Sequence, residues 1–197
     1  MPDTHAPVPG SLTIAAAQQD MRDAYLGGAS GMFVSGCVWA VAGVVCLWHT
    51  PQAAIWALYV GGVLIHPLSG LLVRALGRSG RHVPGNPLGM LAFATTIWMI
   101  LMLALAYGIA LWRIELFFPA VLCVIGGRYL TFATLFGTKV FWVCGAVLAL
   151  AGYGLAKMGA APAAGAFAGA VIEIVFSVII LAGARRGSRA TPAPLPS

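Results

Sequence analysis

Six long apolar runs, separated by short segments rich in glycine, proline and polar residues, dominate the chain. They cover approximately residues 31–48, 53–76, 88–112, 115–136, 140–158 and 164–183. A helix that crosses a bilayer requires about 17–25 predominantly apolar residues, and each run reaches that length. The pattern therefore predicts an all-α fold, a six-helix transmembrane bundle of a polytopic membrane protein.

The segments that flank these runs have a different composition. Residues 1–10 contain three prolines and a glycine, which predicts a disordered tail. Residues 11–30 place apolar side chains at helical spacing and predict a short amphipathic helix leading into span one. This helix would lie at the membrane interface or simply extend the first span. Residues 184–197 are basic and then proline-rich, which predicts a second disordered tail.

Composition narrows the class of protein further. Of the 197 residues, 60% are hydrophobic and only 8% are charged, and the mean hydropathy is +0.93. About a quarter of the residues in a soluble domain are charged. The composition therefore excludes an ordinary soluble domain, and the length leaves no room for one beside six spans.

The net charge of +6 follows the topology of the spans. Positively charged residues concentrate in the cytoplasmic loops of membrane proteins, and they also attract anionic lipid headgroups. With both termini cytoplasmic, eight basic residues lie inside and two, Arg113 and Lys157, lie outside; the eight are Arg22, Arg74, Arg78, Arg81, Lys139, Arg185, Arg186 and Arg189. The predicted partner is thus a lipid bilayer and no nucleic acid.

Motifs for metal or nucleophile chemistry are missing from the sequence. The four cysteines lie inside apolar runs without CxxC or Cys/His spacing, which argues against a disulfide framework or a zinc site. There is no HExxH, no GxSxG and no pair of acidic residues within a run. We therefore predict no cofactor, and the sequence does not favour an enzyme. The N-terminus lacks the basic and apolar segments of a cleaved signal peptide.

Three ionisable residues interrupt three different apolar runs: His66, Arg128 and Glu173. A charge near the centre of a bilayer costs at least ~2.5 kcal/mol, so these side chains are expected to face protein partners or water. Glu173 belongs to a four-residue repeat of small and polar positions, which directs it into the bundle; the other members are Gly165, Gly169 and Ser177.

We hypothesise that these residues converge on a midplane site for a small anionic or polar solute. Arg128 would attract the solute, Glu173 would neutralise Arg128 in the empty state, and His66 could take up a proton. Tyr59 shares a helical face with His66, and Thr131 lies one turn from Arg128, so both join the candidate site. These features predict a small transporter or channel-like protein.

Two other interpretations of the same residues remain open. An ion pair between Arg128 and Glu173 could serve only to lock helices together. Alternatively, the Arg128 side chain could extend along its helix to the cytoplasmic boundary.

The segment between the second and third runs carries the strongest basic cluster between spans. Arg78, Arg81, His82 and Asn86 could meet a phosphorylated lipid headgroup, which would suit a membrane-embedded enzyme; topology-setting charge and turn formation also explain them. A third alternative is a structural or accessory subunit. Small-residue faces on the first and sixth runs make a homo-oligomer plausible.

Several motifs resemble those of a known family. They are HPLSGLLVRALGR at 66–78, GNPLG at 85–89, TIWM at 96–99 and GGRYLTFATLFG at 126–137. On these motifs the chain resembles an uncharacterised family of bacterial multi-pass membrane proteins, known only as a domain of unknown function, over about residues 27–155. The resemblance implies a location in the bacterial cytoplasmic (inner) membrane and no chemical activity.

Overall fold

The computed structural model describes residues 12–189, and no strand occurs among them. Within that range six helices are long and apolar enough to cross a membrane. The six helices are α2 (Ala29–Trp48), α3 (Pro51–Ala75), α4 (Pro87–Trp112), α5 (Phe117–Phe136), α6 (Val140–Lys157) and α7 (Pro162–Arg189). The predicted all-α fold with six spans is confirmed, and the protein is a multi-pass membrane protein.

Short polar and glycine signals in the sequence set the ends of these helices. Thr50 Oγ1 accepts a hydrogen bond from the Ala53 N–H at 3.1 Å, and a proline opens α3 directly after it. Asn86 Oδ1 accepts from the Leu88 N–H at 3.0 Å and begins α4 in the same way. At the other end of a helix, Gly137 closes α5 with a φ of 63°, a left-handed conformation that glycine adopts without strain.

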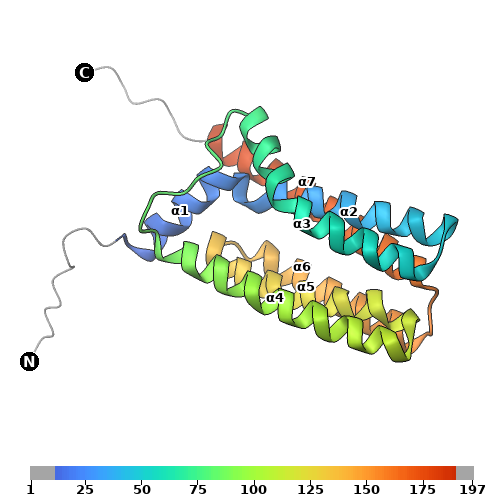
Figure 1. Cartoon of the computed structure of the whole chain (residues 1–197). Coiled ribbons are helices and arrows are strands. Elements are labelled where there is room, and N and C mark those ends of the chain that lie inside the picture. Colours follow the sequence, from blue (N-terminus) through green and yellow to red (C-terminus); the bar gives the residue numbers. More distant parts are fainter. Residues whose placement is uncertain (1–11, 190–197) are drawn as a thin grey trace, which may run out of the picture.

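The six spans form two layers (Figure 1). One layer contains α2, α3 and α7, and the other contains α4, α5 and α6. Contacts of α7 with α6 and α5 join the layers. By contrast, the backbones of α3 and α4 make few close contacts, and the two helices meet through side chains such as Tyr59 and Tyr107 near one end. The layers are therefore joined closely on the side of α7 and more loosely on the side of α3 and α4.

Glycine lets the helices within and between layers approach closely. A Cβ on Gly126 of α5 would lie 2.6 Å from the carbonyl oxygen of Gly145 on α6, and the reverse distance is the same. A Cβ on Gly36 of α2 would lie 2.7 Å from Ile174, and one on Gly169 of α7 would lie 2.6 Å from Trp39. The small-residue faces of the first and sixth spans therefore pack against each other within the chain.

A further helix, α1 (Ile14–Tyr25), precedes the first span within the segment 11–30. It does not run straight into α2, because Leu26, Gly27 and Gly28 of the short helix η1 (Leu26–Gly28) all have positive φ angles. α1 instead lies across one end of the bundle (Figure 1) and contacts α4 and α5. Ala17, Met21 and Ala24 form its buried face.

The last helix extends into the segment predicted to be a C-terminal tail. α7 continues to Arg189, so the tail expected over 184–197 does not begin at residue 184. The physical reason is that residues 184–189 contain no proline and include alanine and arginine, which favour helix. Residues 190–197 and the predicted N-terminal tail at 1–10 lie outside the described residues.

Candidate functional site

Arg128 lies near the middle of α5 and directs its guanidinium towards α4. Nη1 donates to Met99 Sδ at 2.7 Å and Nη2 donates to Thr96 Oγ1 at 3.0 Å. The Phe132 ring centroid lies 5.1 Å from Cζ. Thr96 and Met99 are themselves near the middle of α4, so the charge stays at mid-depth. The alternative that Arg128 extends to the cytoplasmic boundary does not describe this structure.

Hydrogen bonding of Arg128 is incomplete. Its Nε is buried and has no partner among the described atoms. The acceptors of Nη1 and Nη2 are a thioether sulfur, which is a weak acceptor, and a neutral hydroxyl. A guanidinium offers five N–H donors in all. Arg128 therefore retains capacity for a stronger, charged acceptor.

Glu173 of α7 lies in the interior between the layers and is 0% exposed. The Tyr129 hydroxyl of α5 donates to its Oε1 at 2.8 Å. Its Oε2 has no partner among the described atoms. Ser35 of α2 lies beside the carboxyl group, which places the side chain among three helices, as its small-residue spacing predicts.

Arg128 and Glu173 do not form the ion pair that the sequence led us to expect. Among the side chains described, the one salt bridge joins Arg113 to Glu115 at 2.7 Å. Adjacent residues point about 100° apart around a helix, so Arg128 faces α4 while Tyr129 faces α7. Tyr129 is thus the direct partner of Glu173, and an Arg128–Glu173 ion pair does not lock the helices.

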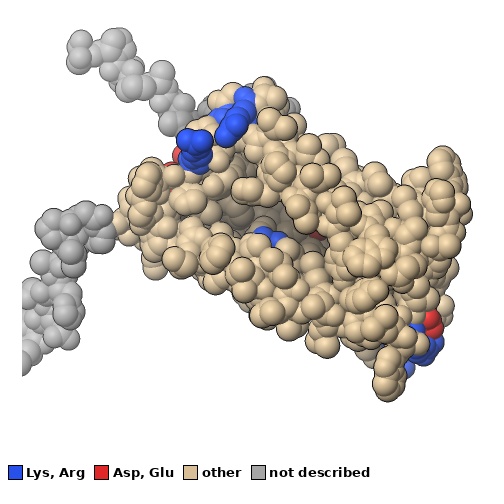
Figure 2. Space-filling view, in the orientation of Figure 1, with Lys and Arg blue, Asp and Glu red and all other residues tan. Residues whose placement is uncertain are grey.

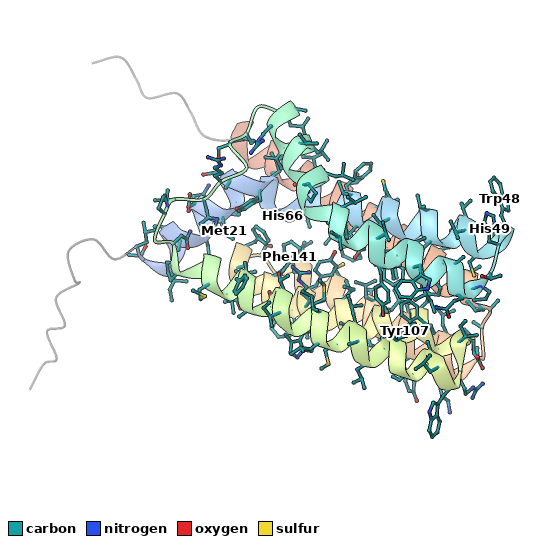
Figure 3. All side chains as sticks on the ribbon, viewed as in Figure 1. Met21, Trp48, His49, His66, Tyr107 and Phe141 are labelled. Atoms are coloured by element: carbon teal, nitrogen blue, oxygen red, sulfur yellow. The ribbon has the colours of Figure 1, made fainter. Side chains whose placement is uncertain are left out.

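Two other candidate residues have partners of their own. Thr131 Oγ1 donates to the Arg128 carbonyl oxygen at 2.7 Å, within α5. The Tyr59 hydroxyl donates to the Leu103 carbonyl oxygen at 2.9 Å, and its ring lies 6.3 Å from that of Tyr107. Tyr107 lies nearer to the end of the bundle marked by Trp48 (Figure 3), so Tyr59 belongs to an aromatic cluster at that end.

His66 lies apart from these residues. It is exposed on the second half of α3, and no described side chain hydrogen-bonds to its ring. Figure 3 places it at the depth of Phe141, closer than Tyr107 to the end covered by α1. Its predicted convergence with Arg128 and Glu173 is therefore not a direct contact.

A hollow opens on the side of the molecule where α3 and α4 separate. Figure 2 shows it midway along the molecule, with basic atoms at its floor. Arg128 likewise lies near the middle of α5, and α3 is mostly exposed from its middle onwards, as at Gly62 and Leu68. The polar centre is thus open towards the side of the bundle.

The four residues of the basic loop divide into two pairs. Arg78 and Arg81 are exposed. Asn86 is buried and its Nδ2 donates to Asp20 Oδ2 at 2.7 Å and to the Ala17 carbonyl oxygen at 3.0 Å. His82 Nδ1 lies 2.8 Å from the Tyr25 hydroxyl. Asn86 and His82 therefore fasten the loop to α1, and only the two arginines are free to meet a headgroup.

Sequence reasoning missed the role of Tyr129. A tyrosine hydroxyl inside an apolar run needs a partner, and that need was the available signal. Thr96 and Met99 were visible as polar or polarisable positions in the third run, but nothing in their spacing pointed to Arg128. Metal ligation finds no support in the part of the chain that is described: no three His, Cys, Asp or Glu side chains cluster there, and the four cysteines are free.

Comparison with known proteins identifies the family but no activity. No curated protein and no solved structure matches the chain. One family model does match, over residues 14–183, and its description is a family of unknown function (DUF7010). That range extends beyond the 27–155 of the resemblance to include α1 and the membrane-spanning part of α7. Since the match covers most of the 197 residues, the chain belongs to this family of unknown function, DUF7010.

Proposed function

We propose that this protein binds a small anionic or polar solute at Arg128 and acts as a small transporter or channel-like protein. The observation that carries the proposal is the incomplete hydrogen bonding of Arg128. Its buried Nε has no partner among the described atoms, and no described carboxylate forms an ion pair with it. An ionised side chain within a membrane is expensive and is a candidate for function by default. An anion would supply the charged acceptor that the protein does not.

The guanidinium of Arg128 has donors that the protein does not use. Nη1 and Nη2 reach Met99 and Thr96 on α4, so the guanidinium is held in one orientation while the buried Nε has no partner. Guanidinium groups bind carboxylates and similar oxyanions through two parallel hydrogen bonds. The Thr96 hydroxyl donates to the Ala92 carbonyl oxygen at 2.9 Å, so the donors for the anion would come from Arg128.

The incomplete covering of Arg128 by protein supports a functional centre over a purely structural one. The hollow in Figure 2 opens where α3 and α4 separate, and a dry, fully paired centre would have no such opening. A location in the bacterial inner membrane with both termini cytoplasmic is consistent with the distribution of basic residues. His66, Tyr59 and Thr131 would contribute only if helices rearrange during the transport cycle.

The alternative functions have less support. An enzyme acting on a lipid headgroup at the basic loop would have to use Arg78 and Arg81, since Asn86 and His82 are engaged with α1. An accessory subunit would not need a charged group with unused donors. Both alternatives are outcomes of the experiment below.

Thermal unfolding of the detergent-solubilised protein tests the binding step. We expect at least one of chloride, nitrate, sulfate and acetate to raise Tm, because a ligand at 100 times its Kd stabilises the folded state by about 2.7 kcal/mol. Arg128→Gln should lose this rise. Arg113→Gln, which removes an exposed arginine paired with Glu115, should keep it.

Uptake of the stabilising anion into proteoliposomes then separates transport from binding alone. Uptake that Arg128→Gln abolishes supports a transporter. Binding without uptake would point to an accessory protein, and no response to any anion would contradict the proposal. A rise in Tm with anionic lipid that requires Arg78 and Arg81 but not Arg128 would favour the headgroup enzyme.

A further inference from the structure

The carboxyl group of Glu173 is not used by the binding site at Arg128, and its surroundings call for a separate explanation. It is 0% exposed and its Oε2 has no hydrogen-bond partner among the described atoms. An ionised carboxylate that is buried without full hydrogen bonding is strongly destabilised, whereas a neutral carboxylic acid is tolerated much better. The geometry therefore favours a protonated Glu173 in the empty protein.

The groups around Glu173 limit what else could control its charge. On α5, Tyr129 donates a hydrogen bond to Oε1 and Arg128 attracts the carboxyl group electrostatically. On α6, Cys144 is the titratable neighbour. α2 presents Ser35 and contributes no charged side chain here. Among the residues that the structure describes, Arg128 is thus the one permanent charge that acts on Glu173.

We infer that Glu173 is a proton-binding site coupled to the anion site, so that a proton on Glu173 and an anion at Arg128 favour each other's binding. The inference rests on the proposed function at Arg128. When Glu173 is neutral, Arg128 gives the centre a net positive charge and attracts an anion. When Glu173 releases its proton to water, the carboxylate offsets that charge and the anion binds less tightly.

Coupling of this kind is reciprocal. If the proton raises anion affinity by some factor, the bound anion strengthens proton binding by the same factor, on the order of fivefold to a hundredfold for typical allosteric pairs. Tyr129 provides the structural link, because it follows Arg128 directly in α5 and holds Oε1 through its hydroxyl. A protein with both sites would move a proton together with its anion.

The first measurement is anion affinity across a pH series with chloride, nitrate and sulfate, whose own charges stay constant. In the wild type the affinity should fall as pH rises, by at most about tenfold per pH unit, across the range in which Glu173 loses its proton. Glu173→Gln keeps an acceptor for Tyr129 and mimics the neutral acid. At every pH this variant should bind the anion with the affinity that the wild type has at low pH. Glu115→Gln, which changes the other glutamate of the chain, should retain the wild-type pH dependence.

Infrared difference spectroscopy observes the proton independently of the anion. The carbonyl stretch of a protonated carboxylic acid should disappear from the wild type as pH rises and should be absent from Glu173→Gln. Anion addition should move its disappearance to higher pH, since the anion favours the protonated form. Tyr129→Phe should also move it to higher pH, because the ionised carboxylate loses its hydrogen-bond donor.

The outcomes separate the two proposals. Anion binding that requires Arg128 but has the same pH dependence in wild type and Glu173→Gln would overturn the proton inference and leave the proposed function standing. No acid band at any pH would also overturn the inference. Anion affinity that follows sodium concentration instead of pH would make Glu173 a sodium site and contradict proton binding. If no anion binds, the proposed function and the coupling both fail, whatever the infrared spectrum shows.

Discussion

The two charged side chains at the centre of the bundle, Arg128 and Glu173, do not pair with each other as their opposite charges predict. Glu173 receives its hydrogen bond from Tyr129, and Arg128 contacts Thr96 and Met99 on another helix. The two charged residues thus belong to neighbouring but distinct environments, one dry and one beside the hollow. This separation allows each to be altered without removing the partner of the other.

At this scale, Tyr129→Phe should destabilise the protein measurably. The variant keeps the ring and its contacts with neighbouring phenylalanines but removes the donor to Glu173 Oε1. Hydrogen bonds inside membrane proteins contribute about 0.6 to 1.7 kcal/mol, so we expect a loss in that range. Equilibrium unfolding in detergent measures it.

The matched control is Tyr153→Phe on α6, whose side chain is exposed at 64% and makes no described hydrogen bond. It should leave the free energy of unfolding unchanged within about 0.5 kcal/mol. Equal losses in the two variants would mean that the Tyr129–Glu173 contact contributes nothing specific.

Close backbone contacts bring helices of the same layer together. Gly126 of α5 and Gly145 of α6 face each other so closely that neither tolerates a Cβ without movement of the backbone. Close approach of this kind replaces the hydrophobic driving force that soluble helices have, because lipid tails are as apolar as the side chains.

Gly126→Ala should therefore weaken or prevent folding, because its Cβ would lie 2.6 Å from the Gly145 carbonyl oxygen. Overpacking of a tight contact costs about 1–3 kcal/mol or more. Gly154→Ala on α6 is the control, since a Cβ there meets nothing within 4 Å. Thermal unfolding in detergent should show a lowered Tm only for the first variant. A normal Tm for Gly126→Ala would show that the close approach of α5 and α6 contributes little to stability.

α1 acts as a brace at one end of the bundle. Its Arg22 Nη1 donates to the Phe136 carbonyl oxygen at 2.6 Å and its Gln18 Nε2 donates to the Thr134 carbonyl oxygen at 2.8 Å. Carbonyl groups at the end of a helix lack partners within that helix. α1 therefore caps α5, while Asp20 holds the loop that leads into α4 through Asn86.

Replacement of Asn86 tests whether the hydrogen bonds between α1 and the loop before α4 stabilise the protein. Asn86→Ala should destabilise the protein by roughly 1–3 kcal/mol, because it removes the N-cap of α4 and both hydrogen bonds to α1. Asn86→Asp keeps the cap acceptor but sets a second carboxylate beside Asp20. If the link to α1 matters, unfolding measurements should find both variants destabilised. A near-normal Asn86→Asp would mean that only the cap contributes.

The molecule as a whole has an even number of spans, so α1 and the end of α7 lie at the same end of the bundle (Figure 1). The basic loop between α3 and α4 lies at that end too. By the positive-inside rule we expect this end to face the cytoplasm.

Cysteine labelling checks this orientation. A membrane-impermeant maleimide should label Met158→Cys in intact cells, because Met158 follows α6 at the outer end and is exposed. Ser79→Cys, in the loop between α3 and α4, should be labelled only in inverted vesicles. The unaltered chain, whose four cysteines lie in spans, is the background control. The opposite pattern would reverse the orientation of the bundle.

The sequence alone determined the number of spans and the inward direction of Glu173. These are local properties: the length of an apolar run must match the bilayer, and four-residue spacing assigns a face of a helix. Caps such as Thr50 and Asn86 are local as well, since they bind N–H groups two or three residues away.

Only the tertiary structure decided which helices pack together and which side chains meet. Tyr129 and Glu173 are 44 residues apart, and Ala17 and Asn86 are 69 apart. Whether such residues touch depends on the rotation and tilt of whole helices, which no local pattern records. Adjacent residues point about 100° apart around a helix, and the rotation of α5 places Tyr129, not Arg128, against Glu173. The opening between α3 and α4 arises in the same way, because α3 packs along α2 and meets α4 through side chains near Tyr59.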